Sequence, residues 1–411
     1  MSRITREALA AFDAADALAS FRERFILPEG VIYLDGNSLG PVPKATPVRI
    51  AEVVAREWGE SLIRAWTEHG WIDLPLRVGD KIARLVGAAP GTTAVADSTS
   101  VNLFKLLAVA LDARPGRPVI LTETGNFPTD LYMAQGLATL LGRGHALRVV
   151  DDPLGALGPD VAVLMLTHVN YRSGAMHDMA AVTRAAHAAG ALVLWDLSHS
   201  VGAVPLQLAA DEVDLAVGCG YKFLNGGPGA PAFLYVAPHL QPGLRLPLTG
   251  WLGHAEPFAF DPVYRAADGI ACAVVGTPPV LNFAALEVGV DLMLQVPMED
   301  LRAKSVRLAE LFLTLVSQEC GEHGFAALTP ADAAQRGSQV SFAHPDGYAI
   351  MQALIERGVI GDFRAPNVLR FGLAPLYVRY VDVWDAVAVL CEVMRTGTWR
   401  NPRFHTQRGV T

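Results

Sequence analysis

The segment from Leu192 to Gly229 constrains the fold more than any other part of the chain. It holds two short apolar runs, residues 191–195 and 215–217; the first ends before an aspartate and the second shortly before a tyrosine–lysine pair. Such runs are typical of buried strands in a parallel sheet. Ligands of open α/β sheets bind beyond the carboxyl ends of the strands. We therefore expect four polar side chains to gather at one sheet edge: Asp196, His199, Tyr221 and Lys222.

A carboxylate and a lysine at one sheet edge are the groups that a pyridoxal 5′-phosphate (PLP) site requires. The lysine carries the cofactor through an imine bond, and the acid keeps the pyridine nitrogen protonated. Each residue alone has an ordinary alternative, because a strand-end Asp196 can cap a turn and Lys222 can be a surface lysine. The glycine-rich continuation Asn225-Gly226-Gly227-Pro228-Gly229 favours the cofactor site.

Three further strand ends are expected at the same edge. Residues 93–96 form a strand, and Asp97-Ser98-Thr99-Ser100 then opens a helix, whose N-terminal N–H groups and positive dipole end suit a phosphate. A helix cap without a ligand is the alternative there. The strands at 118–121 and 161–166 lead to three more candidates: Phe127, Asp130 and Thr167.

Length and pattern predict an α/β protein of two domains. The 411 residues exceed what one hydrophobic core usually supports, and 51% hydrophobic residues against 18% charged ones indicate a large buried sheet. We expect an N-terminal segment (1–45), a large domain with a mainly parallel seven-stranded sheet (46–297), a small C-terminal α+β domain (298–395) and a frayed tail (396–411).

Composition excludes several other classes. A net charge of −8 argues against nucleic-acid binding. The N-terminus lacks an apolar signal core and no run reaches about 18 apolar residues, so we expect a cytoplasmic protein without membrane spans. The cysteines show no metal-binding spacing, so no metal is expected, and we interpret all four as reduced thiols: Cys219, Cys272, Cys320 and Cys391.

Six segments together resemble kynureninases, which are PLP enzymes of the aspartate-aminotransferase fold. Each segment is weak evidence alone, but all six follow the order of the family and span nearly the whole chain. They are Asp35-Gly36-Asn37-Ser38-Leu39-Gly40, Asn126-Phe127-Pro128-Thr129-Asp130, Trp195-Asp196-Leu197-Ser198-His199-Ser200, Gly220-Tyr221-Lys222, Gly250-Trp251 and Arg370-Phe371-Gly372-Leu373-Ala374-Pro375-Leu376-Tyr377.

The resemblance implies a set of site residues. The PLP contacts would be Thr99, Ser100, Phe127, Asp130, Thr167, Asp196, His199, Tyr221, Lys222, Trp251 and Thr277. Trp251 and Thr277 would reach the cofactor of a partner subunit, which implies a homodimer with shared sites. Arg370 would clamp the substrate α-carboxylate, a task suited to a guanidinium; a surface arginine at a strand end is the alternative. Ser38 and Trp66 complete the predicted substrate site.

The implied reaction is the hydrolysis of L-kynurenine, and more weakly of 3-hydroxykynurenine, to anthranilate and L-alanine in tryptophan degradation and NAD biosynthesis. Lys222 would move the Cα proton, and Tyr221 would bond the phosphate and relay a proton. The face of Trp66 suits an unsubstituted ring, with His69 as the competing pocket residue. A cysteine desulfurase, a class V aminotransferase and a catalytically inactive PLP-fold binding protein remain alternatives.

Overall fold

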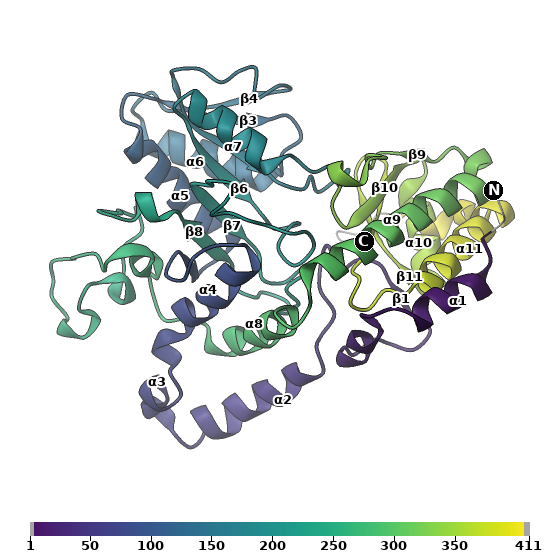
Figure 1. Ribbon diagram of the computed structural model, residues 1–411, viewed down its shortest axis with the longest axis horizontal. Coiled ribbons are helices and arrows are strands. Elements are labelled where there is room, and N and C mark those ends of the chain that lie inside the picture. Colours follow the sequence, from purple (N-terminus) through teal and green to yellow (C-terminus); the bar gives the residue numbers. More distant parts are fainter. Residues whose placement is uncertain (1–3, 407–411) are drawn as a thin grey trace.

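The computed structural model describes residues 4–406, which form two lobes. The chain crosses between the lobes before α2 (Ala45–Glu52) and again between α8 (Val280–Met293) and α9 (Met298–Glu319) (Figure 1). The larger lobe is built on a seven-stranded sheet in the order β2-β8-β7-β6-β5-β3-β4. Strand β8 runs opposite to the other six strands, which are parallel to one another, so the expected mainly parallel sheet is confirmed. The strands are β2 (Thr93–Val95), β3 (Val119–Glu123), β4 (Ala146–Val150), β5 (Val161–Thr167), β6 (Leu192–Asp196), β7 (Leu215–Gly218) and β8 (Phe233–Val236).

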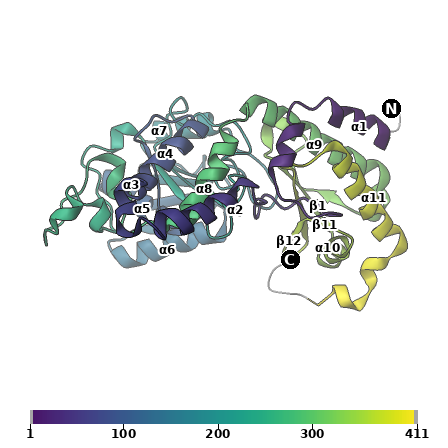
Figure 2. The same ribbon diagram turned by 90° about the horizontal axis from the view of Figure 1, so that it is seen from below.

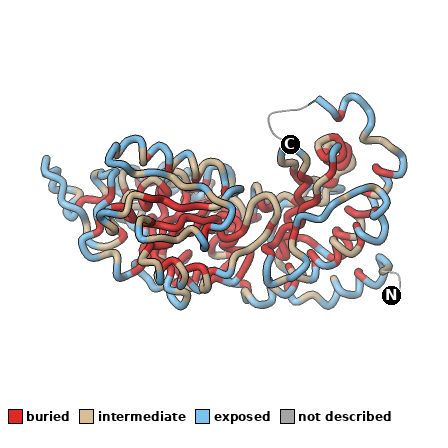
Figure 3. The backbone as a smooth tube through the Cα atoms, turned by 90° about the horizontal axis from the view of Figure 1, so that it is seen from above, coloured by how far each residue is buried: buried red, intermediate tan, exposed pale blue. Residues whose placement is uncertain are grey.

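Helices cover both faces of this sheet, which explains why its central strands are apolar at every position. In β6, Leu192 and Leu194 pack toward α5 and α6, whereas Val193 and Trp195 pack toward α4, α7 and α8. All of β6 is buried, and the strands form the buried centre of the lobe in Figure 3. The covering helices are α4 (Leu74–Leu85), α5 (Thr99–Ala113), α6 (Pro128–Leu141), α7 (Met179–Ala188) and α8 (Val280–Met293).

The smaller lobe has an antiparallel four-stranded sheet in the order β12-β13-β10-β9. Its elements are α9 (Met298–Glu319), β9 (Ala326–Ala327), β10 (Gln339–Ala343), α10 (Gly347–Glu356), β11 (Val359–Ile360), β12 (Asp362–Arg364), β13 (Val368–Gly372) and α11 (Tyr380–Thr396). The N-terminal segment belongs to this lobe. Helix α1 (Arg6–Ala14) lies along α11, and β1 (Ile32–Tyr33) pairs in parallel with β11 (Figure 2).

Two segments of the larger lobe lie against each other at one end: the α2–α3 segment, through which the chain enters the lobe, and the loop between β8 and α8. Helix α2 (Ala45–Glu52) packs on α8, and the short α3 (Ala65–Glu68) follows at the end of the lobe (Figure 1). The loop between β8 and α8 projects from the same end, and its Trp251 ring lies 6.1 Å from that of Trp66. These two segments therefore form one exposed extension of the larger lobe.

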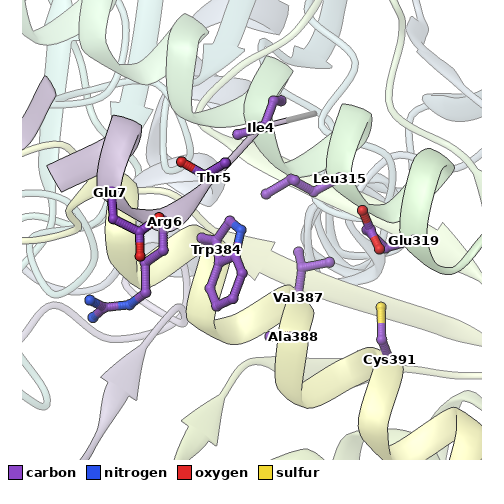
Figure 4. Close-up of a pocket in the computed structure, with 10 residues that line it drawn as sticks. All are labelled: Ile4, Thr5, Arg6, Glu7, Leu315, Glu319, Trp384, Val387, Ala388 and Cys391. Atoms are coloured by element: carbon purple, nitrogen blue, oxygen red, sulfur yellow. The ribbon is translucent and has the colours of Figure 1, made fainter. Parts of the chain in front are cut away.

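The expectation of four reduced cysteines is wrong for two of them. Cys320, directly after α9, and Cys391, in α11, form a disulfide with a Cα–Cα distance of 5.7 Å, whereas Cys219 and Cys272 are free and buried. The two partners are 71 residues apart in sequence, so only the packing of α9 on α11 shows that they meet. Cys391 borders a 460 Å³ pocket between the N-terminal segment, α9 and α11 (Figure 4).

The expected fraying after residue 396 is not seen in the described part of the tail. Two 3-10 turns, Thr398–Arg400 and Pro402–Phe404, continue the chain, and Phe404 is buried. Residues 407–411 lie outside the described residues. Between residues 4 and 406, no single helix has the length and hydropathy of a membrane span; α8 and α9 meet that test only as a pair bent by 86°. The same residues contain no cluster of potential metal ligands.

Candidate active site

A cavity of 290 Å³ lies at the carboxyl edge of the larger sheet. It brings together nine of the residues that the sequence placed at this edge, although they come from five separate loops and helix ends. The lining residues are Thr99, Ser100, Phe127, Thr129, Asp130, Thr167, Tyr171, Asp196, Ser198, His199, Tyr221 and Lys222. The parallel strands β3, β5, β6 and β7 all end toward this edge, which is why residues far apart in sequence converge there.

Lys222 is held at the cavity by the turn that follows β7. The turn needs glycine at position 220, because a Cβ there would lie 2.6 Å from the Pro231 carbonyl oxygen. The Lys222 Nζ lies 3.0 Å from His199 Nε2 and 5.7 Å from the centre of the Tyr221 ring. Burial and the nearby Lys222 charge lower the pKa of His199 well below its usual range. The imidazole is therefore neutral at pH 7 and accepts a hydrogen bond from the lysine.

Two buried carboxylates face the same cavity. Asp196 Oδ1 accepts hydrogen bonds from the Ser198 N–H at 2.9 Å and the Ser198 hydroxyl at 2.6 Å. Burial raises the pKa of Asp196, and burial together with the Asp196 charge raises the pKa of Asp130 well above its usual range. Thr167 Oγ1 lies 3.4 Å from Asp130 Oδ2. The cavity thus holds two buried carboxyl groups but one lysine. A second positive charge, such as a protonated ring nitrogen of a ligand, would stabilise the ionised form of these carboxyl groups.

One wall of the cavity is aromatic. The ring of Phe127 meets the edge of the Tyr171 ring at 5.2 Å and remains 39% exposed, which leaves a face available for a ligand ring. Tyr171 follows β5 in a loop and was not among the predicted site residues. No local pattern distinguishes it from any other loop tyrosine.

The helix start at which we expected a phosphate site lies on the cavity. Helix α5 begins at Thr99, and the Ser98 side chain accepts from the Val101 N–H at 3.4 Å. Thr99 and Ser100 both line the cavity. Their backbone N–H groups lie in the first turn, where no helical carbonyl can accept from them. This end of the cavity is therefore suited to an anion.

Arg370 lies beside this cavity in the smaller lobe. It is in the middle of β13 and 1% exposed, so it is not a surface residue. Its guanidinium bonds Asp362, the Tyr171 carbonyl oxygen and the Ser38 hydroxyl. Asp362 also pairs with Arg364 at 2.8 Å. The prediction included Arg370 and Ser38 but missed Asp362 and Arg364, although Asp362-Phe363-Arg364 shortly upstream was a visible charged signal.

Five predicted site residues do not line the Lys222 cavity of their own chain. Ser38 and Arg370 lie beside it, and the other three are Trp66, Trp251 and Thr277. Trp66 packs edge-on against Trp251, and Thr277 is exposed on the loop before α8. His69, the competing pocket residue, lies 3.0 Å from the Ser61 hydroxyl through its Nε2. The roles of Trp66, Trp251 and Thr277 therefore stay predictions, and those of Trp251 and Thr277 involve a partner subunit.

A lysine and an aspartate at this edge of a mainly parallel sheet, with a helix start beside them, define a PLP-dependent enzyme of the aspartate-aminotransferase fold. Solved structures agree on the fold. A cystine C–S lyase has a TM-score of 0.76 at 20% identity and covers 89% of this chain and 98% of its own. A cysteine desulfurase from Thermococcus onnurineus NA1 has a TM-score of 0.77 at 17% identity, covering 92% and 98%.

Sequence relatives show which family of PLP-dependent enzymes this chain belongs to. The family model of the kynureninase C-terminal domain matches residues 301–390. Kynureninases from Pseudomonas fluorescens and Burkholderia pseudomallei are 51% and 52% identical to this chain, and each alignment covers 99% of this chain and 100% of the relative. The chain belongs to the kynureninase family.

Proposed function

We propose that this protein is a PLP-dependent hydrolase that cleaves L-kynurenine to anthranilate and L-alanine. One observation carries the proposal beyond family membership: Lys222 lies in a cavity that combines two buried carboxylates, an aromatic wall and a helix start, with a buried arginine beside it. Each part matches one group of the cofactor or of an α-amino acid substrate. The proposal also retains weaker turnover of 3-hydroxykynurenine.

Different residues of the cavity would contact different groups of PLP. Lys222 would carry it, Asp196 would accept a hydrogen bond from its ring nitrogen, Phe127 would cover its ring, and the N–H groups of Thr99 and Ser100 would take its phosphate. When bound, PLP supplies an electron sink that stabilises negative charge on carbon next to the amino group.

The reaction adds one water across the Cβ–Cγ bond: the aryl carbonyl carbon gains a hydroxyl group and leaves as anthranilate, and Cβ gains a proton and leaves as L-alanine. The chain itself contributes proton transfers and orientation. Lys222, once free of the cofactor, removes the substrate Cα proton and returns it as a general acid. His199, neutral and 3.0 Å from the amine, holds Lys222 in the orientation for this transfer. Burial raises the pKa of Tyr221, so its phenol stays protonated and can donate to the phosphate or relay a proton. Arg370 fixes the α-carboxylate.

A desulfurase is the main alternative, because solved desulfurases share the fold. Such an enzyme uses a cysteine thiol as the nucleophile, which must be accessible. In this chain Cys219 and Cys272 are buried and Cys320 is joined to Cys391. Burial also raises the pKa of Cys272, which disfavours its reactive thiolate. The positions of the cysteines therefore favour the hydrolase.

The decisive test adds L-kynurenine to purified, PLP-loaded protein and follows anthranilate fluorescence. We expect stoichiometric anthranilate and L-alanine, together with an absorbance band of the cofactor–lysine imine that is lost in Lys222→Ala. Alanine formed from cysteine, with no anthranilate from kynurenine, would support a desulfurase instead. A PLP-loaded protein that turns over neither substrate would support the inactive binding protein.

We further propose a homodimer that shares its active sites. Exposed apolar side chains cluster on the extension formed by α2, α3 and the loop before α8: Val48 is 71% exposed, Ile63 78%, Phe260 79% and Val263 67%. Patches of this kind mark protein interfaces, and this one carries Trp66, Trp251 and Thr277. Light scattering should give twice the chain mass. Ile63→Asp should produce a monomer without activity, and a monomeric wild-type protein with full activity would contradict shared sites.

We also propose a cytoplasmic location and a role in tryptophan degradation that feeds NAD biosynthesis. The support for the metabolic role is the chemistry of the expected substrate, and the two free cysteines, Cys219 and Cys272, agree with a reducing compartment. The Cys320–Cys391 disulfide is unusual for a reducing compartment. Cell fractionation, with thiol counting on freshly lysed cells, tests the location and the disulfide together.

A further inference from the structure

The guanidinium of Arg370 belongs to a largely buried cluster of charged side chains. This cluster contains a carboxylate and a second arginine, which binding of a substrate carboxylate by Arg370 alone would not require. The cluster joins Arg370 and Asp362, which are cross-strand neighbours in β13 and β12, with Arg364 and Ser38. The side chains of Arg370 and Asp362 are 2% and 1% exposed, whereas that of Arg364 is 37% exposed. None of these four residues lines the cavity that would hold the cofactor.

Asp362 occupies one complete edge of the Arg370 guanidinium. Arg370 Nε donates to Asp362 Oδ1 at 2.6 Å, and Nη2 donates to Asp362 Oδ2. This two-point contact fixes the plane and the rotation of the guanidinium. Asp362 Oδ2 also accepts from the Ser38 hydroxyl at 2.7 Å. Its carboxylate is therefore fully used inside the protein, and the arginines hold the pKa of Asp362 below its usual value despite burial.

The opposite edge of Arg370 consists of Nη1 and the second N–H of Nη2, and among the described residues its hydrogen bonds go to neutral acceptors. Nη1 donates to the Tyr171 carbonyl oxygen, and Nη2 donates to Ser38 Oγ at 3.1 Å. A carboxylate is a stronger acceptor for a guanidinium than a carbonyl or a hydroxyl. A substrate carboxylate can displace these two acceptors but cannot displace Asp362 without leaving a buried charge unpaired.

The charges in the cluster leave room for one more carboxylate. Arg370 and Arg364 carry two positive charges against the one negative charge of Asp362. The Asp35 carboxyl faces the same cluster, and burial together with Asp362 raises its pKa to about 7. The phenols of Tyr33 and Tyr377, which also face Asp35, have raised pKa values and stay neutral. With Asp35 protonated, the cluster has a net charge of +1.

We infer that Asp362 is the positioning residue of the substrate-carboxylate site: it holds Arg370 by one edge, so that the Nη1–Nη2 edge is presented to the α-carboxylate. Arg364 also forms an ion pair with Asp362. Because Asp362 neutralises one of the two arginine charges, Arg364 leaves the cluster with the positive charge that binds the substrate carboxylate. The inference rests on the proposed function, because it assumes an α-amino acid substrate. It assigns roles to Asp362 and Arg364 that the resemblance did not include.

The test compares two ligands that differ only in the group that Arg370 is proposed to hold. Kynuramine is L-kynurenine without its α-carboxylate. Binding of each ligand to PLP-loaded wild-type protein, Asp362→Asn and Asp362→Glu would be measured by titration of the cofactor absorbance, with KM and kcat for L-kynurenine alongside. Asp300→Asn, an exposed aspartate at the start of α9, is the control. Thermal unfolding reports whether each variant is folded.

In Asp362→Asn we expect L-kynurenine to bind at least about tenfold more weakly, with KM raised more than kcat is lowered, while kynuramine binds within about twofold of wild type. Asp362→Glu keeps the charge but displaces the guanidinium, so it should give an intermediate loss. An equal loss for both ligands, or no loss for either, would overturn the positioning role. If Asp362→Asn does not fold, Asp362→Glu carries the same comparison. Failure of wild-type protein to form anthranilate would count against the proposed function instead.

Discussion

Replacement of Asp196 by asparagine is the most informative single change, because it removes a charge with almost no change in shape. Asp196 is 4% exposed, and its Oδ1 accepts two hydrogen bonds from Ser198 that an asparagine oxygen can also accept. Burial raises the pKa of Asp196, so its charge is costly in the protein without cofactor. We therefore expect Asp196→Asn without PLP to be no less stable than wild type.

The loss should appear only when the cofactor is bound. A charged hydrogen bond to the ring nitrogen is worth about 1.5–3 kcal/mol, which corresponds to roughly 10- to 150-fold weaker PLP binding. An adjacent carboxylate raises the pKa of a basic nitrogen by about 1–3 units, so the variant loses about 1.4–4 kcal/mol of stabilisation of the protonated ring. We expect kcat to fall by about tenfold to a thousandfold at saturating PLP.

The assay measures anthranilate release at increasing PLP concentrations, with cofactor affinity from absorbance titration and unfolding temperature with and without PLP. The exposed Asp112 in α5 supplies the control, Asp112→Asn. Turnover near the wild-type rate at saturating PLP would remove Asp196 from the ring-nitrogen role. A large loss of stability without cofactor would instead show that the Asp196 charge supports the fold.

Four further predictions concern the lysine, the arginine, the pH dependence and the substrate. Borohydride reduction should place the pyridoxyl label on Lys222, and a label on another lysine would refute that assignment. Arg370→Lys keeps the charge but loses the two-edged geometry, so KM for L-kynurenine should rise about tenfold or more, whereas an unchanged KM would exclude the clamp. Asp35 is neutral below its pKa of about 7 and negative above it, so KM should rise with pH above 7 by up to about tenfold per pH unit. Asp35→Asn should abolish this rise. The same pH profile of KM in the variant and in wild type would contradict the proposed charge balance. L-Kynurenine should exceed 3-hydroxykynurenine by about tenfold in kcat/KM, or about 1.4 kcal/mol, because the Trp66 face offers a hydroxyl no acceptor; the reverse ratio would favour His69 in the pocket.

Much of the fold and of the cofactor cavity was predictable because the signals are local. The apolar run before Asp196 is continuous since both faces of β6 are covered, and burial of each residue in that strand leaves a direct trace in the sequence. The start of α5 at Thr99 follows from the capping side chain of Ser98. Parallel strands then bring Asp196, Thr167 and Lys222 to one edge without further information.

The position of β4 and the direction of β8 could not be predicted from such local signals. Strand β4 lies at the edge of the sheet and is partly exposed throughout, and Arg148 interrupts its apolar residues. Strand β8 has an apolar run, but its antiparallel direction depends on which neighbours it pairs with. A pattern of side chains reports burial and period, whereas strand order and direction are properties of the assembled sheet.

Tertiary structure alone decided the contacts between distant segments. The sequence by itself determined an α/β sheet with a lysine and an aspartate at its carboxyl edge, because those features depend on neighbouring residues. The edge of Arg370 that Asp362 occupies, the position of the Tyr171 carbonyl and the Cys320–Cys391 disulfide depend on how separate segments pack. Such contacts gain their energy only after the chain has folded, so no local pattern of residue types encodes them.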